Sequence, residues 1–309
     1  MTSSNSARKY IDIDVPAFDP WRVIPITHHL VDHPLLQRGS LVELAKRLEA
    51  RGRVRTHSDK AKAESSFHDA PGEHPNTVSV SKSIEEIETA HAWMSLLNVQ
   101  TDPLYRELVD GVIDDVKPVF DQKDPGVCYR GGWIFVTSPN AVTPFHMDHE
   151  HNFIVQILGK KRIHVWDPWD RTVVPERGQE LFHTYASREL VKFDESLRAK
   201  AMVFDLEPGM GAFMPSTAPH LVENGDNPSI TMSFTFYTDS TRRRALVYRG
   251  NTHLRRLGFD PKPFGRSQLR DEALHRAMQA YSAAKDLILQ KLGRDVHPMT
   301  SPYAFHLYS

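Results

Sequence analysis

Residues 141–168 read AVTPFHMDHEHNFIVQILGKKRIHVWDP, and this stretch decides the fold. It contains two short runs rich in branched and aromatic side chains, NFIVQIL (152–158) and RIHVWD (162–167), separated by Gly159-Lys160-Lys161. Such runs are typical of β-strands, and a break that contains glycine is typical of a turn. The stretch therefore predicts two successive strands joined by a hairpin turn.

The same pattern extends in both directions along the chain. The further short runs are GWIFVTS (132–138), AMVFDL (201–206), GAFMP (211–215) and SITMSFTFY (229–237). Many short strands without alternating helices favour an antiparallel sandwich or barrel over a parallel α/β sheet. We therefore expect a mainly β fold whose barrel covers residues 126–240.

The N-terminal side of this barrel carries helical patterns. Residues 40–51 have apolar side chains at helical spacing, and a helix over 103–120 is expected after Asp102-Pro103. Ser83 before an acidic turn indicates the start of another helix. Residues 54–80 are polar and lack periodicity, which predicts a long loop. We expect a mostly helical region over residues 1–125, packed on the barrel.

Beyond residue 240 the pattern is helical again, and residues 241–309 are expected to form a C-terminal helical extension. Its longest predicted helix covers 268–292 and has an apolar stripe of Leu269, Ala273, Ala277, Ala280, Ala284 and Ile288. Such a stripe must cover either the barrel or a second subunit, so a homodimer through this helix is one expectation.

Composition and charge are those of an ordinary globular protein, with 40% hydrophobic and 25% charged residues. A net charge of −1 gives no basis for binding nucleic acid or an anionic membrane. Cys128 is the only cysteine, so no intramolecular disulfide can form and a reducing compartment is expected. No apolar run suits a membrane span or a signal peptide. We therefore expect a cytoplasmic protein without membrane or nucleic-acid partners.

Three residues have the types and spacing of an open metal site. Residues two apart in a strand share a face, so His146 and Asp148 can bind one ion. His220, which follows the predicted strand at 211–215, supplies a third ligand. Two imidazoles and one carboxylate leave coordination positions open, as in non-haem Fe(II) oxygenases. A structural zinc site would instead be closed, generally by cysteines that this chain lacks.

Lys161 indicates an anion pocket beside this metal site. The predicted turn at Gly159-Lys160 brings Lys161 back beside the strand of His146. A lysine directed into a barrel is costly to desolvate unless an anion accompanies it, and the hydroxyl of Thr143 can bond the same carboxylate. The alternative is a solvated lysine within the basic run 160–162.

With these residues identified, residues 141–168 resemble the core of the JmjC and cupin-like 2-oxoglutarate oxygenases. Within that superfamily they most resemble the asparaginyl hydroxylases that act on hypoxia-inducible factor. Residues 206–237 resemble the later strands of the same family, including the third metal ligand. The helical regions at each end of the chain carry no motif of the family.

The resemblance implies a double-stranded β-helix, the cupin or jelly-roll barrel, with Fe(II) as cofactor and 2-oxoglutarate as cosubstrate. It implies that Thr143 and Lys161 bind the distal carboxylate of 2-oxoglutarate and that Asn152 hydrogen-bonds near the proximal one. Thr235 stands where the hydroxylases have another asparagine, so its side chain is shorter. Trp133 and Tyr129 are candidates for the pocket wall or, equally, for the barrel core.

The implied enzyme is a non-haem iron dioxygenase that consumes O₂ and 2-oxoglutarate and releases succinate and CO₂. It would hydroxylate a C–H bond of a protein or peptide side chain, or of a small molecule. Two other activities remain open: a JmjC-type N-methyl-lysine demethylase, and a non-redox metal-binding cupin such as an isomerase or a ligand-binding module. An inactive regulatory barrel is a further alternative. Demethylases more commonly have Glu where Asp148 stands, and a non-redox cupin leaves Thr143, Asn152 and Lys161 without a common purpose.

Substrate specificity is expected to reside outside the recognisable core, in residues 54–80, residues 169–200 and the C-terminal helix. Candidates for substrate contacts there are Arg130, His183, Tyr185 and Arg188.

Overall fold

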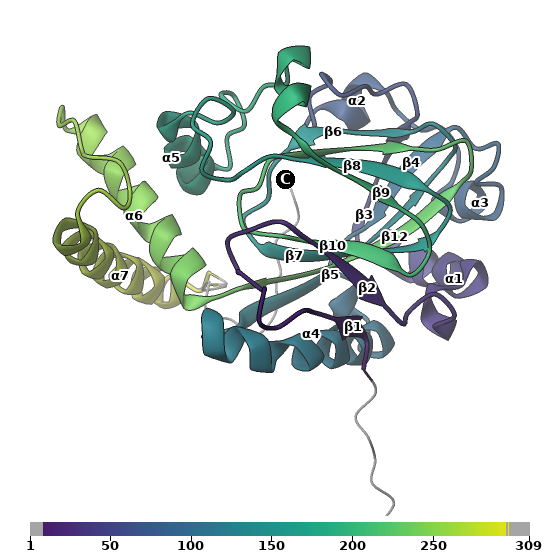
Figure 1. The fold of residues 1–309 in the computed structure, drawn as a ribbon, viewed down its shortest axis with the longest axis horizontal. Coiled ribbons are helices and arrows are strands. Elements are labelled where there is room, and N and C mark those ends of the chain that lie inside the picture. Colours follow the sequence, from purple (N-terminus) through teal and green to yellow (C-terminus); the bar gives the residue numbers. More distant parts are fainter. Residues whose placement is uncertain (1–8, 295, 297–309) are drawn as a thin grey trace, which may run out of the picture.

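Two antiparallel sheets face each other in the computed structural model, which describes residues 9–294 and 296 (Figure 1). In the described part, the larger sheet has the order β1-β2-β10-β7-β12-β5-β4-β3. Its strands, in that order, are Ile11–Asp12, Ile24–His28, Met210–Met214, His151–Leu158, Ser229–Tyr237, Cys128–Thr137, Ala92–Leu96 and Val54–Ser58. The smaller sheet has the order β6-β11-β8-β9, with the strands Val142–His146, His220–Asn224, Lys161–Val165 and Met202–Leu206. The predicted double-stranded β-helix is thereby confirmed.

Alternating side chains give the larger sheet one face toward helices and one face toward the barrel interior. On β5, Ile134 and Val136 belong to the main hydrophobic core, whereas Trp133 and Phe135 line an internal cavity. The same alternation on β12 directs Phe234 to the core and its polar neighbours inward. A cavity that contains polar side chains can therefore lie inside a barrel whose other face packs against an apolar core.

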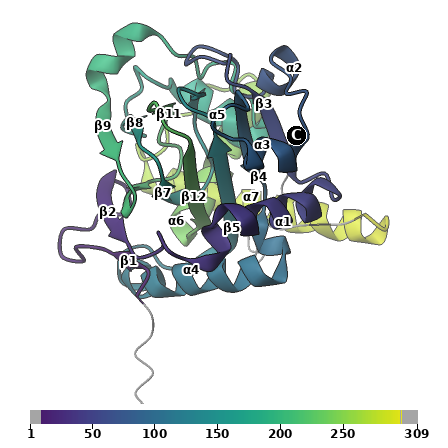
Figure 2. The same cartoon turned by 90° about the vertical axis from the view of Figure 1, so that its right-hand side faces the viewer.

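Helices cover the outer face of the larger sheet and one end of the barrel. They are α1 (Arg38–Glu49), α2 (Ala70–Glu73), α3 (Val80–Glu85), α4 (Pro103–Lys123), α5 (Glu176–Tyr185), α6 (Asp239–Arg256) and α7 (Gln268–Lys291), with 3₁₀ turns η1 (Pro34–Leu36), η2 (Val99–Thr101) and η3 (Glu195–Lys200). Figure 2 shows α4 running below the larger sheet. The predicted helices at 40–51 and 103–120 correspond to α1 and α4, and Asp102 caps α4 by accepting from the Leu104 amide.

The prediction of a long loop over residues 54–80 is wrong. Strand β3 forms the edge of the larger sheet, followed by α2, and α3 starts at Val80 and ends at Glu85 rather than beginning at Ser83. An edge strand with only one buried residue has no clear alternation, so the run VRTHS carries no strand signal. Residues 1–125 thus supply four strands of the larger sheet as well as helices, which the predicted mostly helical region did not include.

The turn at Gly159 is not a hairpin within one sheet. It leads from β7 in the larger sheet to β8 in the smaller one, where β8 lies between β11 and β9. Gly159 has a φ of 73°, and a Cβ there would collide with the Pro228 carbonyl, so only glycine fits this crossing. Lys161 is therefore two strands from His146, with β11 between them, rather than beside it.

The C-terminal extension is helical as predicted, and the helix expected over 268–292 is α7. Its predicted apolar stripe is exposed, however, because α7 packs on α6 through other residues, among them the buried Asp271 and Met278. Figure 1 shows α5, α6 and α7 together at one end of the barrel. Within the described residues, no helix has the length and apolarity that crossing a membrane requires.

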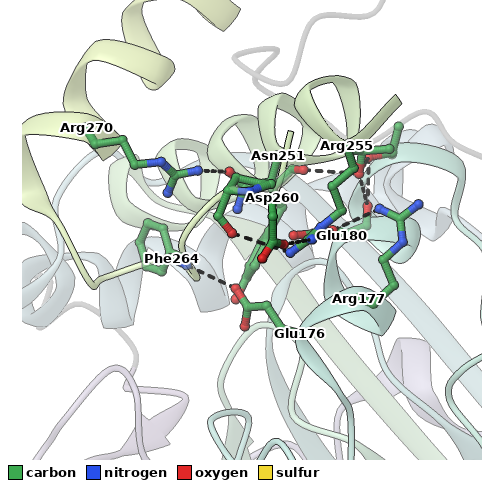
Figure 3. Close-up of polar contacts among 12 residues, drawn as sticks. Glu176, Arg177, Glu180, Asn251, Arg255, Asp260, Phe264 and Arg270 are labelled. Atoms are coloured by element: carbon green, nitrogen blue, oxygen red, sulfur yellow. Dashed lines mark hydrogen bonds and ion pairs between the residues drawn. The ribbon is translucent and has the colours of Figure 1, made fainter. Parts of the chain in front are cut away.

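Polar contacts join α5 to α6 and the segment that follows it (Figure 3). The carboxylate of Glu180 is fully buried, and its Oε2 accepts from Arg177 at 2.9 Å and from Arg255 at 2.9 Å. Glu176 accepts from the Phe264 amide at 3.0 Å. The bond from Arg255 fixes α5 on α6, and residues 186–193 follow α5 directly.

Candidate metal centre

The smaller sheet brings the three predicted metal ligands together at one end. His146 is the last residue of β6 and lies opposite His220, the first residue of β11, while Asp148 follows β6 by two residues. Asp148 Oδ2 lies 3.8 Å from His146 Nε2 and 3.7 Å from His220 Nε2. All three ligand atoms are within 4.8 Å of one another. These separations allow all three residues to bind one ion.

Backbone carbonyls orient both imidazoles toward this point. His146 Nδ1 donates to the Pro144 carbonyl at 2.8 Å, and His220 Nδ1 donates to the Ala218 carbonyl at 3.0 Å. Because a carbonyl only accepts, the proton resides on Nδ1 and the lone pair of Nε2 is left for a metal. Burial, with smaller effects from His220 and Arg188, holds the pKa of His146 well below its usual range. The donor set thus fits a divalent ion such as Fe(II).

Thr143, Asn152 and Lys161 line one cavity together with the three ligand residues. Lys161 is buried, and no described carboxylate forms an ion pair with it. Desolvation lowers the pKa of Lys161 to about 7. The alternative of a solvated lysine is therefore excluded, and an anion that enters this cavity would meet a buried ammonium group.

Thr235 faces Asn152 across the β12–β7 pair and is buried in the same interior. Its hydroxyl accepts from Trp133 Nε1 at 3.3 Å, and both residues line a second lobe of the cavity. Asn152 Oδ1 is buried without a hydrogen-bond partner among the described residues, so its amide has capacity for a ligand. Trp133 is thus a wall residue, whereas Tyr129 stacks on Tyr237 in a separate core cluster.

Three cavity residues were missed by the sequence analysis because they come from elements without a motif. Phe67, between β3 and α2, stacks on the His146 ring with centroids 3.9 Å apart and planes at 5°. Trp93 on β4 donates from Nε1 to the Thr143 hydroxyl at 2.8 Å, which fixes that side chain. Arg55 on β3 has its guanidinium 4.4 Å from the Phe67 ring centre. Only tertiary packing brings these residues to the site.

Of the predicted substrate-contact candidates, Arg188 and Tyr185 lie near the site. Arg188 Nη2 donates to the Met147 carbonyl at 3.3 Å and lies 3.9 Å from Asp148 Oδ1. Tyr185 and Arg188 line a groove of about 650 Å³ between residues 63–69 and 185–193. His183 is buried against Tyr248, and Arg130 pairs with Asp110 and Asp114 on α4.

The chain belongs to the family of proteins with a cupin-like domain, whose family model matches residues 24–242. It is 32% identical over 117 residues to the HSPB1-associated protein 1 homolog of Danio rerio, which aligns 35% of this chain and 26% of that protein. It is 34% identical over 80 residues to lysine-specific demethylase 8 of Danio rerio, which aligns 24% of this chain and 20% of that protein. The aligned regions therefore span about a quarter and a fifth of these curated relatives.

Among solved structures, the fold is similar to the X-ray structure of ycfD from Escherichia coli. The TM-score is 0.50 at 15% identity, covering 89% of this chain and 69% of that chain. YcfD, described as a ribosomal oxygenase, has also been solved in complex with cobalt and 2-oxoglutarate, and that structure matches with a TM-score of 0.47 at 15% identity over 89% of this chain and 68% of that chain. At such identity the likeness shows a shared fold.

Proposed function

We propose that this protein is an Fe(II)- and 2-oxoglutarate-dependent dioxygenase that hydroxylates a C–H bond of its substrate. The observation that supports this most directly is the cavity that joins an open His-Asp-His ligand set to the buried, unpaired Lys161. A metal site alone is common to many cupins. A buried lysine beside it has a physical reason only if the second ligand of the site is an anion.

The residues of this chain would divide the work as follows. His146, Asp148 and His220 hold Fe(II), which supplies the binding and activation of O₂ when it is bound. Lys161 and Thr143 bind the distal carboxylate of 2-oxoglutarate, and the Trp93 indole keeps the Thr143 hydroxyl in position. Asn152 on β7 and Thr235 on β12 would hydrogen-bond 2-oxoglutarate near its proximal carboxylate. Phe67 covers the His146 ring and excludes water from that side.

The prime substrate that we propose is a protein or peptide side chain. A groove of about 650 Å³ is lined in part by Phe67 and Arg188, both of which contact metal-ligand residues. A groove of this size outside a narrow cavity suits an extended segment of which one side chain reaches inward. Within this proposal, the resemblance to the asparaginyl hydroxylases of hypoxia-inducible factor favours a protein side chain. A small-molecule substrate is the alternative.

An anaerobic titration tests the cofactor part of the proposal. Protein mixed with Fe(II) and then 2-oxoglutarate should develop a metal-to-ligand charge-transfer band, and His146→Ala and Asp148→Ala should abolish it. His29→Ala, which changes an exposed surface histidine, is the matched control. A non-redox cupin would bind the metal but give no band with 2-oxoglutarate, and that result would reject the proposal.

A substrate screen tests the reaction. Succinate release is measured against peptide and metabolite pools, and products are identified by mass spectrometry. Hydroxylation adds one oxygen atom to the product, whereas demethylation of a methylated lysine removes a methyl group. The second outcome would favour the demethylase activity that the relative lysine-specific demethylase 8 brings into consideration.

A further inference from the structure

Arg244, on α6, is a buried cation outside the metal site. Its side chain is only 1% exposed, and no described carboxylate forms an ion pair with it. Within the described residues its Nε and Nη1 atoms have no hydrogen-bond partner. A buried charge without a carboxylate in ion-pair contact costs several kcal/mol of folding free energy, which an apolar residue of similar volume would avoid. A residue kept at such a cost needs a reason other than stability.

Aromatic rings from three separate segments enclose this guanidinium. Its central carbon lies 4.3 Å from the centre of the Trp169 ring, 5.1 Å from Trp21 and 5.6 Å from Tyr248. Cation–π contacts of this kind offset part of the desolvation cost and hold the planar group in one orientation. Arg244 is thus held rigidly, so the hydrogen bond that its Nη2 donates has a fixed direction.

That hydrogen bond goes to the turn between β10 and β11. Arg244 Nη2 donates to Thr217 Oγ1 at 2.8 Å, and the Thr217 amide donates to the Asp148 carbonyl at 2.8 Å. Thr217 therefore links the loop that carries Asp148 to the turn that leads into His220. Its neighbour Ser216 adds a second link, because its hydroxyl donates to the His149 carbonyl at 2.6 Å.

Thr217 adopts a conformation that its side chain disfavours. Its φ is 61°, in the left-handed region that β-branched residues rarely occupy. Such strain persists only where the surrounding contacts impose it, and it is concentrated at functional sites. The Arg244 and Asp148 contacts are the two bonds that hold Thr217 in this conformation.

The base of α6 is itself anchored near the same place. Thr238 and Ser240 both donate to Asp124 Oδ2 at 2.7 Å, at the end of α4. The same carboxylate oxygen lies 3.4 Å from His151 Nε2, while His151 Nδ1 accepts from the Ser216 amide at 3.1 Å. Asp124 thus anchors the start of α6 and, through His151, also contacts the turn at Ser216. Arg244 reaches the same turn at Thr217.

We propose that Arg244 is a positioning residue for the metal centre: through Thr217 it fixes the spacing of Asp148 and His220. Arg244 acts without contacting the metal or the substrate. In many metalloproteins, hydrogen bonds to the ligand residues orient those ligands in the same way. The inference depends on the proposed function only in that the three residues bind a divalent metal. Through Arg244, α6 would contribute to the geometry of the metal site.

Titration of the apoprotein with Co(II), followed by its visible absorption, tests this role together with thermal unfolding. Arg244→Met keeps the aliphatic volume and removes the donor, and Thr217→Val removes the acceptor at nearly the same shape. We expect each variant to weaken Co(II) binding by roughly 10-fold to 100-fold. The apoprotein of Arg244→Met should unfold at the same or a higher temperature, because an unpaired charge has been removed. A merely structural arginine would lower the unfolding temperature and leave the affinity for Co(II) unchanged.

Two comparisons make the result decisive. The double variant Arg244→Met/Thr217→Val should bind Co(II) no more weakly than the weaker-binding single variant, because both substitutions remove the same Arg244–Thr217 hydrogen bond. Arg243→Met, which alters the half-exposed neighbour that pairs with Glu272, should bind as the wild type does. Wild-type affinity in Arg244→Met, or additive losses in the double variant, would overturn the inference. Absence of Co(II) binding by the wild-type protein would instead reject the metal site itself.

Discussion

Lys161 is the residue in which stability and proposed function conflict most directly. Its ammonium group is buried, and desolvation lowers its pKa to about 7 from the ordinary 10.5. We expect Lys161→Met to raise the unfolding temperature of the apoprotein at pH 6, because a buried unpaired charge is replaced by an apolar side chain. Calorimetry with and without 2-oxoglutarate measures both effects, since the same variant should lose the stabilisation that 2-oxoglutarate gives the wild type.

The stability that Lys161→Met gains should depend on pH, because the pKa of Lys161 is lower in the folded protein than in the unfolded chain. The folded state binds the lysine proton more weakly than the unfolded chain, so the wild type gains stability as the pH rises from about 7 toward 10.5. The advantage of Lys161→Met should therefore shrink over the same range. An advantage that is constant from pH 6 to pH 10 would show that the lysine is not desolvated.

Cosubstrate binding should depend on pH in the opposite sense. A dicarboxylate binds the protonated lysine, so above pH 7 its binding requires the uptake of one proton. We expect the affinity for 2-oxoglutarate to fall as the pH rises from 7 to 9, by up to tenfold per pH unit. Calorimetric titrations in buffers with different ionisation enthalpies measure the proton uptake. Lys161→Arg, whose charge does not titrate in this range, should remove both the pH dependence and the uptake.

The residues of the metal site could be predicted from the short spacing of His146 and Asp148 and from the family resemblance of residues 141–168. The strand geometry expected for them was only partly right, because Asp148 lies two residues beyond β6 and Lys161 lies two strands from His146. Phe67, Trp93 and Arg55 could not be predicted, since they come from elements at the far edge of the larger sheet. Their position depends on how the sheets close, which no local pattern of the sequence contains.

At the scale of elements, predictability followed the length and composition of the runs. Strands β5, β7 and β12 have 10, 8 and 9 residues rich in β-branched and aromatic side chains and were found. Strands β3 (VRTHS) and β4 (AWMSL) have five residues each and fewer such side chains, so they carry a weaker strand signal. The helix α4 was found because Asp102-Pro103 is typical of a helix start.

The joint between α5 and α6 supports a prediction at this scale. Glu180 is fully buried and accepts from Arg177 and Arg255, whose side chains are partly exposed. Glu180→Ala removes two hydrogen bonds to charged groups, each contributing about 1.5 to 3 kcal/mol, while the remaining arginines are partly solvated, so a total cost of about 2 to 3 kcal/mol is expected. We expect Glu180→Ala to destabilise the protein by about that amount in urea unfolding. Glu272→Ala, which breaks only exposed pairs with Arg243 and Arg276, should cost about 1 kcal/mol or less. Equal costs for the two variants would contradict the picture of α5 as a docked helix.

At the scale of the whole molecule, the helical end of the barrel leaves an apolar surface on α7. Tyr281, Leu287, Ile288 and Leu292 are each more than half exposed to solvent within the described structure. Clustered exposed apolar side chains on one helix usually mark an interaction surface. The predicted homodimer through the C-terminal helix would cover this surface, and α6 would then connect the dimer to the metal site through Arg244.

We expect the wild-type protein to have about twice the chain mass of 35.3 kDa in light scattering after size-exclusion chromatography. Leu287→Glu/Ile288→Glu should shift the mass to that of a monomer, because burying two carboxylates in an apolar interface is strongly unfavourable. Gln279→Glu/Gln290→Glu adds the same charge at exposed polar positions of α7 and should leave the dimer intact. If dissociation also weakens Co(II) binding, the route through α6 links assembly to the metal centre. If the wild type is monomeric at all concentrations, the exposed face of α7 serves another partner and the homodimer prediction is wrong.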